Sequence, residues 1–300
     1  MNQSVQAPTI PLAVAMLGIA TYTGMDVFMK GLAIEMGVYN AMLWRTALSL
    51  AIASVLFFWR GVQWPDTQVI KLHVWRGVVT SLMAFLFFWG LVYVPLAEAI
   101  GLSFIAPLIA LYLAAVLLQE KISSKAVLAS LIGLMGALVI VGGKLGGEYG
   151  ENMGKGVAAI LLSALMYAYN LILQRQQAQV AEPAEIAFFQ NGTVVVVYLL
   201  FAPFWAVAPP LELLPNLAAT AVLGIIALLL ISWAYARAEA RVLIPVEYTA
   251  FIWAALLGWL VFAEDVTTAT LAGTALIVVG CLVAARQRPQ QLDHVETTAV

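Results

Sequence analysis

The feature that most constrains this chain is a series of apolar runs, each close to the length that crosses a bilayer. Cutting the chain at its polar and proline-rich breaks gives ten runs, at 12–29, 39–59, 74–93, 96–118, 126–143, 156–173, 186–207, 217–236, 242–262 and 269–285. A spanning helix needs about 20 apolar residues, and a helix satisfies its own backbone hydrogen bonds in lipid. The alternation and turn signals of a transmembrane barrel are lacking. We therefore expect an all-α integral membrane protein with ten transmembrane helices.

The composition excludes an ordinary soluble domain. Of the 300 residues, 63% are hydrophobic and only 10% are charged, and the mean hydropathy is +0.97. A soluble domain keeps about 25% charged residues. The net charge of −2 comes without a basic run, so no nucleic-acid partner is expected. Cys281 is the only cysteine, which excludes intramolecular disulfides and cysteine-built metal sites.

Basic residues are distributed unevenly between the two sets of loops. The tails and even-numbered loops hold ten of them: Arg60, Lys71, Arg76, Lys121, Lys125, Arg175, Arg237, Arg241, Arg286 and Arg288. The other side holds only Lys30, Lys144 and Lys155, and Arg45 lies within a span. The positive-inside rule then predicts a multi-pass protein of the cell inner membrane with both termini in the cytoplasm.

An internal repeat becomes visible when the chain is compared with itself at an offset of 144 residues. The matched pairs are Trp89 with Trp233, Glu120 with Glu264, Gly136 with Gly280, and Asp26 with Asn170. Because each half has five spans, an odd number, the halves are expected to lie in opposite senses. The predicted organisation is a first repeat at 1–143, a glycine-rich connecting loop at 144–155, a second repeat at 156–286 and a polar tail at 287–300. Two inverted five-helix repeats are typical of secondary transporters, with the substrate site between the halves.

Ionisable residues at membrane depth are costly, about 2.5–3.5 kcal/mol each on insertion scales, so each needs a reason. Asp26 is interpreted either as the local ion-pair partner of Lys30, four residues on, or as a cation or proton site. Arg45 can snorkel outward, pair with Asp26 or Glu98, or bind a carboxylate. Glu98 fits an interfacial or a functional position equally. Glu247 is interpreted as pointing into a wet cavity between the halves, or as snorkelling at the cytoplasmic entrance.

Aromatic residues at span depth are the other candidates for substrate contact. Trp89, Trp233, Tyr248 and Tyr22 are predicted to line the site, together with Arg45 and Glu247, because aromatic faces can stack a planar substrate or hold a cation. Asp26 and Glu247 are the candidates for proton coupling. His73 and His294 are assigned to a loop and to the tail, too far apart for a ligand pair, and no metal site or catalytic residue is predicted.

Two segments carry a family resemblance. "AEAIGLSFIAPLIALYLAAVLLQEKIS" at 97–123 and "PVEYTAFIWAALLGWLVFAEDVT" at 245–267 resemble the paired signature of the drug/metabolite transporter superfamily, in its ten-span EamA-type branch. That signature is a proline-bearing helix ending in Gly-Glu in each half. Here Glu120 and Glu264 occupy the Glu positions, whereas Gln119 and Ala263 replace the usual Gly. The resemblance implies a transporter of small metabolites, amino acids or drugs that works by alternating access. It also implies that Glu120 and Glu264, at opposite membrane faces, cap and anchor the helix that follows each.

These observations together predict a gradient-driven transporter of a small amino-acid-like or heterocyclic metabolite, not an enzyme, with no cofactor. Its expected partners are the substrate, protons and the lipid bilayer, as a monomer or homodimer. The glycine-rich loop has Gly156 after Lys155, so it does not match a phosphate-binding loop. The alternative is a non-transporting scaffold or sensor with the same fold, and a membrane-embedded transferase is a third possibility.

Overall fold

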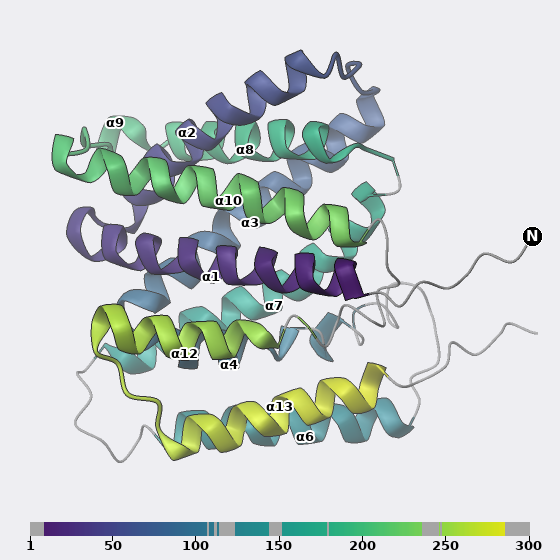
Figure 1. Cartoon of the computed structure of the whole chain (residues 1–300), viewed down its shortest axis with the longest axis vertical. Coiled ribbons are helices and arrows are strands. Elements are labelled where there is room, and N and C mark those ends of the chain that lie inside the picture. Colours follow the sequence, from purple (N-terminus) through teal and green to yellow (C-terminus); the bar gives the residue numbers. More distant parts are fainter. Residues whose placement is uncertain are drawn as a thin grey trace, which may run out of the picture.

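The computed structural model describes residues 9–106, 108–110, 113, 124–143, 152–178, 180–235, 246 and 248–285. Throughout these residues the regular structure is helical, as predicted, and most helices run roughly side by side (Figure 1). Most of the predicted connection at 144–155 and the whole tail at 287–300 lie outside the described residues. The domain boundaries therefore remain a prediction.

The helices follow the predicted apolar runs. Their bounds are α1 Thr9–Met36, α2 Val38–Trp59, α3 Thr67–Tyr93, α4 Leu96–Ser103, α6 Ser124–Gly142, α7 Met153–Ala178, α8 Pro183–Leu199, α9 Ala202–Trp205, the 3-10 turn η1 Leu211–Leu213, α10 Leu214–Tyr235, α12 Thr249–Phe262 and α13 Thr268–Ala285.

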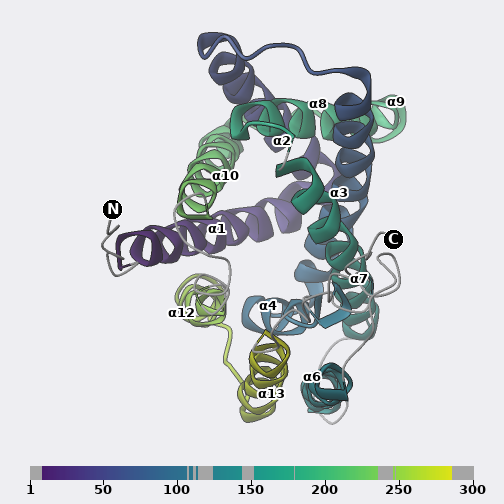
Figure 2. The same cartoon turned by 90° about the vertical axis from the view of Figure 1, so that its right-hand side faces the viewer.

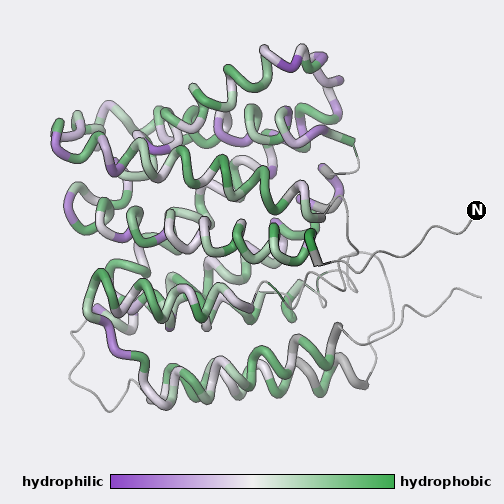
Figure 3. The backbone as a smooth tube through the Cα atoms, viewed as in Figure 1, coloured by the Kyte–Doolittle hydropathy of each residue, from purple (hydrophilic) through white to green (hydrophobic). Residues whose placement is uncertain are grey.

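Five of the described helices are long and apolar enough to cross a membrane, at 10–36, 38–59, 67–93, 153–174 and 211–231. Shorter apolar helices are found at 96–110, 131–142, 249–262 and 268–280. Hydrophilic residues gather mainly toward helix ends and connections (Figure 3). These lengths fit a multi-pass membrane protein, while the count of ten spans stays a prediction.

The start of α3 differs from the sequence-based expectation. The predicted span began at residue 74, but α3 begins at Thr67, where Asp66 caps it by accepting hydrogen bonds from the backbone N–H groups of Gln68 and Val69, both at 2.9 Å. Asp side chains at this position satisfy backbone donors that have no partner within the helix. The earlier start places His73, assigned to a loop from the sequence, inside a helix, and moves Arg76, counted with the basic residues of that loop, to the third turn of α3.

The helices pack in reciprocal pairs across the two halves of the chain. The first helix of each half packs against the third helix of the other half, as α1 with α10 and α7 with α3. The second, fourth and fifth helices pack against their own counterparts, as α2 with α8, α4 with α12 and α6 with α13 (Figure 2). Each of these contacts is therefore matched by one that exchanging the halves would generate.

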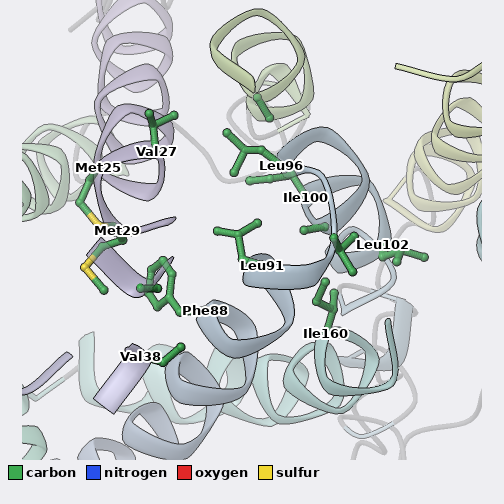
Figure 4. Packing of buried hydrophobic residues seen from close by; sticks show 14 of the residues in the cluster. Met25, Val27, Met29, Val38, Phe88, Leu91, Leu96, Ile100, Leu102 and Ile160 are labelled. Atoms are coloured by element: carbon green, nitrogen blue, oxygen red, sulfur yellow. The ribbon is translucent and has the colours of Figure 1, made fainter. Parts of the chain in front are cut away.

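A buried apolar cluster joins helices from both halves of the chain. Met29 of α1, Leu91 of α3, Leu96 of α4 and Ile160 of α7 are each almost fully buried within it (Figure 4). Large apolar side chains elsewhere, such as Phe58, face outward and are exposed. Lipid would cover such side chains in a membrane.

Small residues on α6 and α13 let the two helices approach closely. A Cβ atom added to Gly136 would lie 2.5 Å from the carbonyl oxygen of Gly273, and one added to Gly273 would lie 2.5 Å from the carbonyl oxygen of Gly136. Backbones pack this closely only where neither side carries a side chain. The two glycines are thus used within the bundle.

Candidate functional site

A buried polar contact joins the two halves where α3 ends and α4 begins. Lys30 of α1 pairs with the Glu264 carboxylate and also donates a 3.0 Å hydrogen bond to the carbonyl oxygen of Val94. The second carboxylate oxygen of Glu264 accepts a 2.8 Å hydrogen bond from the backbone N–H of Leu96, the first residue of α4. Only 5% of the Lys30 side chain and 17% of the Glu264 side chain are exposed. Glu264 therefore neutralises a buried cation and caps a helix of the other half.

The backbone around residue 263 directs Glu264 into this position. Ala263 ends α12 in the left-handed region, at φ 53° and ψ 36°, and the N–H of Glu264 then bonds back to the carbonyl oxygen of Gly258 at 3.2 Å. A Cβ atom at Gly258 would lie 2.9 Å from the Glu264 carboxylate. The left-handed conformation favours glycine, which explains why a Gly-Glu pair suits this turn and marks Ala263 as a strained replacement.

Two expectations about these residues are wrong. Lys30 does not pair with Asp26, its neighbour along α1, but with Glu264. Glu264 does not cap the helix that follows it, because the side chain of Thr267 does so by accepting a 3.1 Å hydrogen bond from the N–H of Thr270. The equivalent role predicted for Glu120 falls on a residue outside the described part of the chain.

Deeper in the bundle, Tyr22, Asp26 and Arg45 form an electrostatically linked group. Tyr22 and Asp26 are four residues apart on α1 and so share a face, and both interact through space with the Arg45 guanidinium of α2. All three side chains are half-buried. The structure therefore brings together three of the residues predicted to form the site.

Arg45 is poorly satisfied where it lies. One terminal nitrogen donates to the Met25 sulfur at 3.0 Å, and the guanidinium carbon lies 6.0 Å from the centre of the Phe88 ring. Its Nε is buried and has no hydrogen-bond partner. A thioether is a weak acceptor and a guanidinium has five N–H donors, so Arg45 retains the capacity to bind a carboxylate.

The matched tryptophans lie on the two helices that pack against the first helix of the opposite half, Trp89 on α3 and Trp233 on α10. Their joint contact with one substrate stays a prediction.

The remaining predicted residues have separate surroundings. Trp89 packs edge-on against Tyr93, with ring centres 5.0 Å apart, and Tyr248 packs edge-on against Phe104 at 5.1 Å. Trp233 is 37% exposed. Glu247 lies outside the described residues, so its predicted place in a cavity wall stays a prediction.

A polar cluster that the sequence interpretation missed lies between α3, α7 and α8. His73 Nε2 contacts a Glu185 carboxylate oxygen at 2.8 Å, and His73 Nδ1 contacts the amide nitrogen of Gln177. Arg76 donates to the Gln177 amide oxygen and, at 3.1 Å, to the Asn170 amide oxygen. All five residues are buried, with His73 and Gln177 at 0% exposure. We call these five residues the His73 network.

One sequence signal could have revealed this network. His73, Arg76 and Thr80 are spaced i, i+3 and i+7, which places them on one helix face, and Thr80 also donates to Asn170, at 3.3 Å. Asn170 had been identified as the repeat counterpart of Asp26. Polar residues on one face of a spanning helix require partners inside the bundle, and here α7 and α8 supply them.

Within the described residues, no group of three His, Cys, Asp or Glu side chains could hold a metal ion. The polar groups present are instead suited to hydrogen bonding, ion pairing and proton exchange. Arg45 offers N–H donors and Asp26 offers acceptor oxygens to a ligand.

Several known transporters are similar in sequence to this chain. The model of the EamA-like transporter family matches the chain twice, over residues 9–142 and 154–286. The pseudopaline exporter CntI of Pseudomonas aeruginosa (strain UCBPP-PA14) is 26% identical over 276 residues, covering 91% of this chain and 95% of that protein. The riboflavin transporter of Brucella anthropi is 23% identical and covers 81% of this chain and 86% of its own length.

Two further comparisons span nearly the whole chain. The S-adenosylmethionine uptake transporter of Rickettsia bellii is 21% identical, covering 93% of this chain and 94% of that protein. A solved crystal structure with 19% sequence identity superposes with a TM-score of 0.62 and covers 92% of this chain and 98% of its own, which shows a shared fold. With the family model matching nearly the full length of both halves, the chain belongs to the EamA-like transporter family.

Proposed function

We propose that this protein is a secondary transporter that moves a small metabolite across the bacterial inner membrane by alternating access. The observation that carries the proposal is the family match in each half, at 9–142 and 154–286. The reciprocal packing of α1 with α10 and of α7 with α3 supports it. Ten spans, in two inverted five-helix repeats with both termini in the cytoplasm, are part of the proposal. In such transporters the two halves rock about a site between them.

The substrate class proposed is an amino-acid-like or heterocyclic metabolite. Arg45 is suited to a carboxylate because its Nε lacks a hydrogen-bond partner, and Asp26 is suited to a cationic group. Tyr22, on the same face of α1 as Asp26, offers a ring for stacking. The relatives' names include an exporter and an uptake transporter, so the direction of transport is left open by the comparison.

Proton coupling through Asp26 or Glu247 is the mechanistic part of the proposal. A carboxylate in a membrane-embedded site can exchange a proton for a cationic substrate, so that one gradient drives the other. The Coulomb attraction between Asp26 and Arg45 would then change whenever either one binds its ligand.

Counterflow in proteoliposomes tests this function. Radiolabelled S-adenosylmethionine, riboflavin and a mixture of amino acids serve as probes, after a thermal-shift screen of the purified protein against a metabolite library. We expect wild-type protein to exchange at least one probe. Arg45→Gln removes a charged hydrogen bond to the substrate, which is worth about 1.5–3 kcal/mol. Because about 1.4 kcal/mol of lost interaction free energy corresponds to a factor of ten, the rate should fall at least about tenfold.

Each site variant has a matched control on its own helix. Arg60→Gln replaces an exposed arginine at the end of α2, and Glu35→Gln replaces an exposed acid of α1. Asp26→Asn is expected to lower counterflow and to flatten its pH dependence, whereas both controls keep the wild-type rate. If no probe is exchanged and no metabolite stabilises the protein, the scaffold or sensor alternative is favoured instead.

A further inference from the structure

The donors and acceptors of the His73 network fix its protonation. Arg76 carries only donors, so the group of Gln177 that faces it must be the amide oxygen. The amide NH2 of Gln177 then donates to Nδ1 of His73, which must be unprotonated. His73 therefore carries its single proton on Nε2 and donates it to Glu185.

This arrangement is balanced in charge only while His73 is neutral. Arg76 contributes one positive charge at one end of the network and Glu185 one negative charge at the other. Among the side chains that the structure describes, Lys71 on α3, Glu182 before α8 and Arg60 after α2 are exposed, while the Arg175 side chain of α7 lies outside the described part. Phe189 stacks on the His73 ring at 4.9 Å and shields it from water.

We propose that the His73–Glu185 pair is a proton-binding site, and that Gln177 couples its occupation to the release of Arg76. The coupling role rests on the proposed transport function, whereas the proton site itself does not. An incoming proton binds Nδ1 of His73, where the Gln177 NH2 now donates. Two donors cannot face each other, so the Gln177 amide turns over and presents its oxygen to His73.

The turned amide has a consequence at its other end. Its NH2 group now faces Arg76, which loses the acceptor oxygen and keeps only Asn170 as a partner. Arg76 lies on α3, and Gln177 and Asn170 lie on α7, so the proton weakens a contact between the two halves. The Arg76 charge also acts through space on Tyr22 of the proposed substrate site. Proton binding at one end of the network thus changes the field at the substrate site.

Solution NMR of the full chain in nanodiscs tests the site without any substrate. The sequence has two histidines, so His294→Gln with ¹⁵N-labelled histidine leaves His73 as the only signal. We expect the Nε2–H tautomer at high pH and a second ring proton, on Nδ1, when the pH is lowered. A His73 ring that stays in that neutral tautomer at every pH at which the protein is folded would overturn the proposal and make the network a static support.

Paired substitutions test the role of the neighbours. Gln177→Leu removes the amide that links His73 to Arg76, so the Arg76 guanidinium signals should stop changing when His73 is protonated. Glu185→Gln removes the carboxylate that accepts the Nε2 proton and pairs with the imidazolium, so the ring should take up its second proton less readily. Gln176→Leu and Glu182→Gln, at exposed positions beside them, should change neither response. If the network variants match their controls, the proposal is wrong.

The same samples distinguish a failure of the proton-site proposal from a failure of the transport proposal. Titration of His73 in a protein that exchanges no probe would contradict the transport proposal and leave the proton site standing. Counterflow by a protein whose His73 never titrates would contradict the proton site and leave transport standing. The wild-type network is titrated without substitutions inside it, so a variant that fails to fold does not remove the test.

Discussion

Replacing Glu264, which follows the end of α12, by Gln should destabilise the protein strongly. The amide oxygen of Gln can still accept the Leu96 N–H, so the substitution removes the ion pair while keeping the cap. Lys30 is then left 5% exposed with only the Val94 carbonyl oxygen as a hydrogen-bond acceptor. Removing one partner of a buried pair costs about 3–5 kcal/mol. The partial exposure of Glu264 places the expected loss near the lower end, at about 3 kcal/mol.

The assay is thermal unfolding of the purified protein, followed by tryptophan fluorescence. For a large domain each 1 kcal/mol shifts Tm by about 2–4 °C, so we expect a fall of about 6–12 °C. Glu264→Ala also removes the cap and should lose about 1 kcal/mol more. The double variant Lys30→Met/Glu264→Gln should recover part of the loss, because it removes the buried unpaired charge. Asp265→Asn, at the exposed next residue, is the control; equal Tm values for it and Glu264→Gln would refute the reasoning.

Three further substitutions test the fold through Tm. Ala263→Gly should raise stability by about 0.5–1 kcal/mol, because the residue lies at φ 53°; a lower Tm would contradict this. Gly136→Ala should lower stability by about 1–3 kcal/mol, since its Cβ would lie 2.5 Å from a carbonyl oxygen of α13, whereas Gly142→Ala, with open space around it, should not. Tyr198→Phe should lose about 1 kcal/mol, because its buried hydroxyl donates a 2.9 Å hydrogen bond to a carbonyl of α3; an unchanged Tm would argue against that bond.

Hydropathy and the repeat were enough to predict the helical fold, because each apolar run is a local property of the chain. The start of α3 was not predicted in this way. The residues before position 74 include the polar His73, and a hydropathy reading places polar residues in loops. Their partners Asn170, Gln177 and Glu185 are roughly a hundred residues away in the sequence, so nothing local shows that they are satisfied inside the bundle.

Only part of the candidate site could be predicted, because helix spacing shows local neighbours but not contacts between residues far apart in the sequence. Tyr22 and Asp26 share a helix face, which their spacing shows directly, and Arg45 had Asp26 as a named candidate partner. The pairing of Lys30 with Glu264 joins residues 234 positions apart, and the helix geometry near Lys30 favoured the closer Asp26.

The proposed transport requires an interior that water reaches at Tyr22, Asp26 and Arg45. The direct measurement is the reaction of Tyr22→Cys, in a Cys281→Ala background, with a membrane-impermeant charged thiol reagent in sealed vesicles. Phe28→Cys, at an exposed apolar position of the same helix, is the control. We expect Tyr22→Cys to react and Phe28→Cys to stay unreactive. A Tyr22→Cys protein that stays unreactive from both sides of the membrane would contradict it.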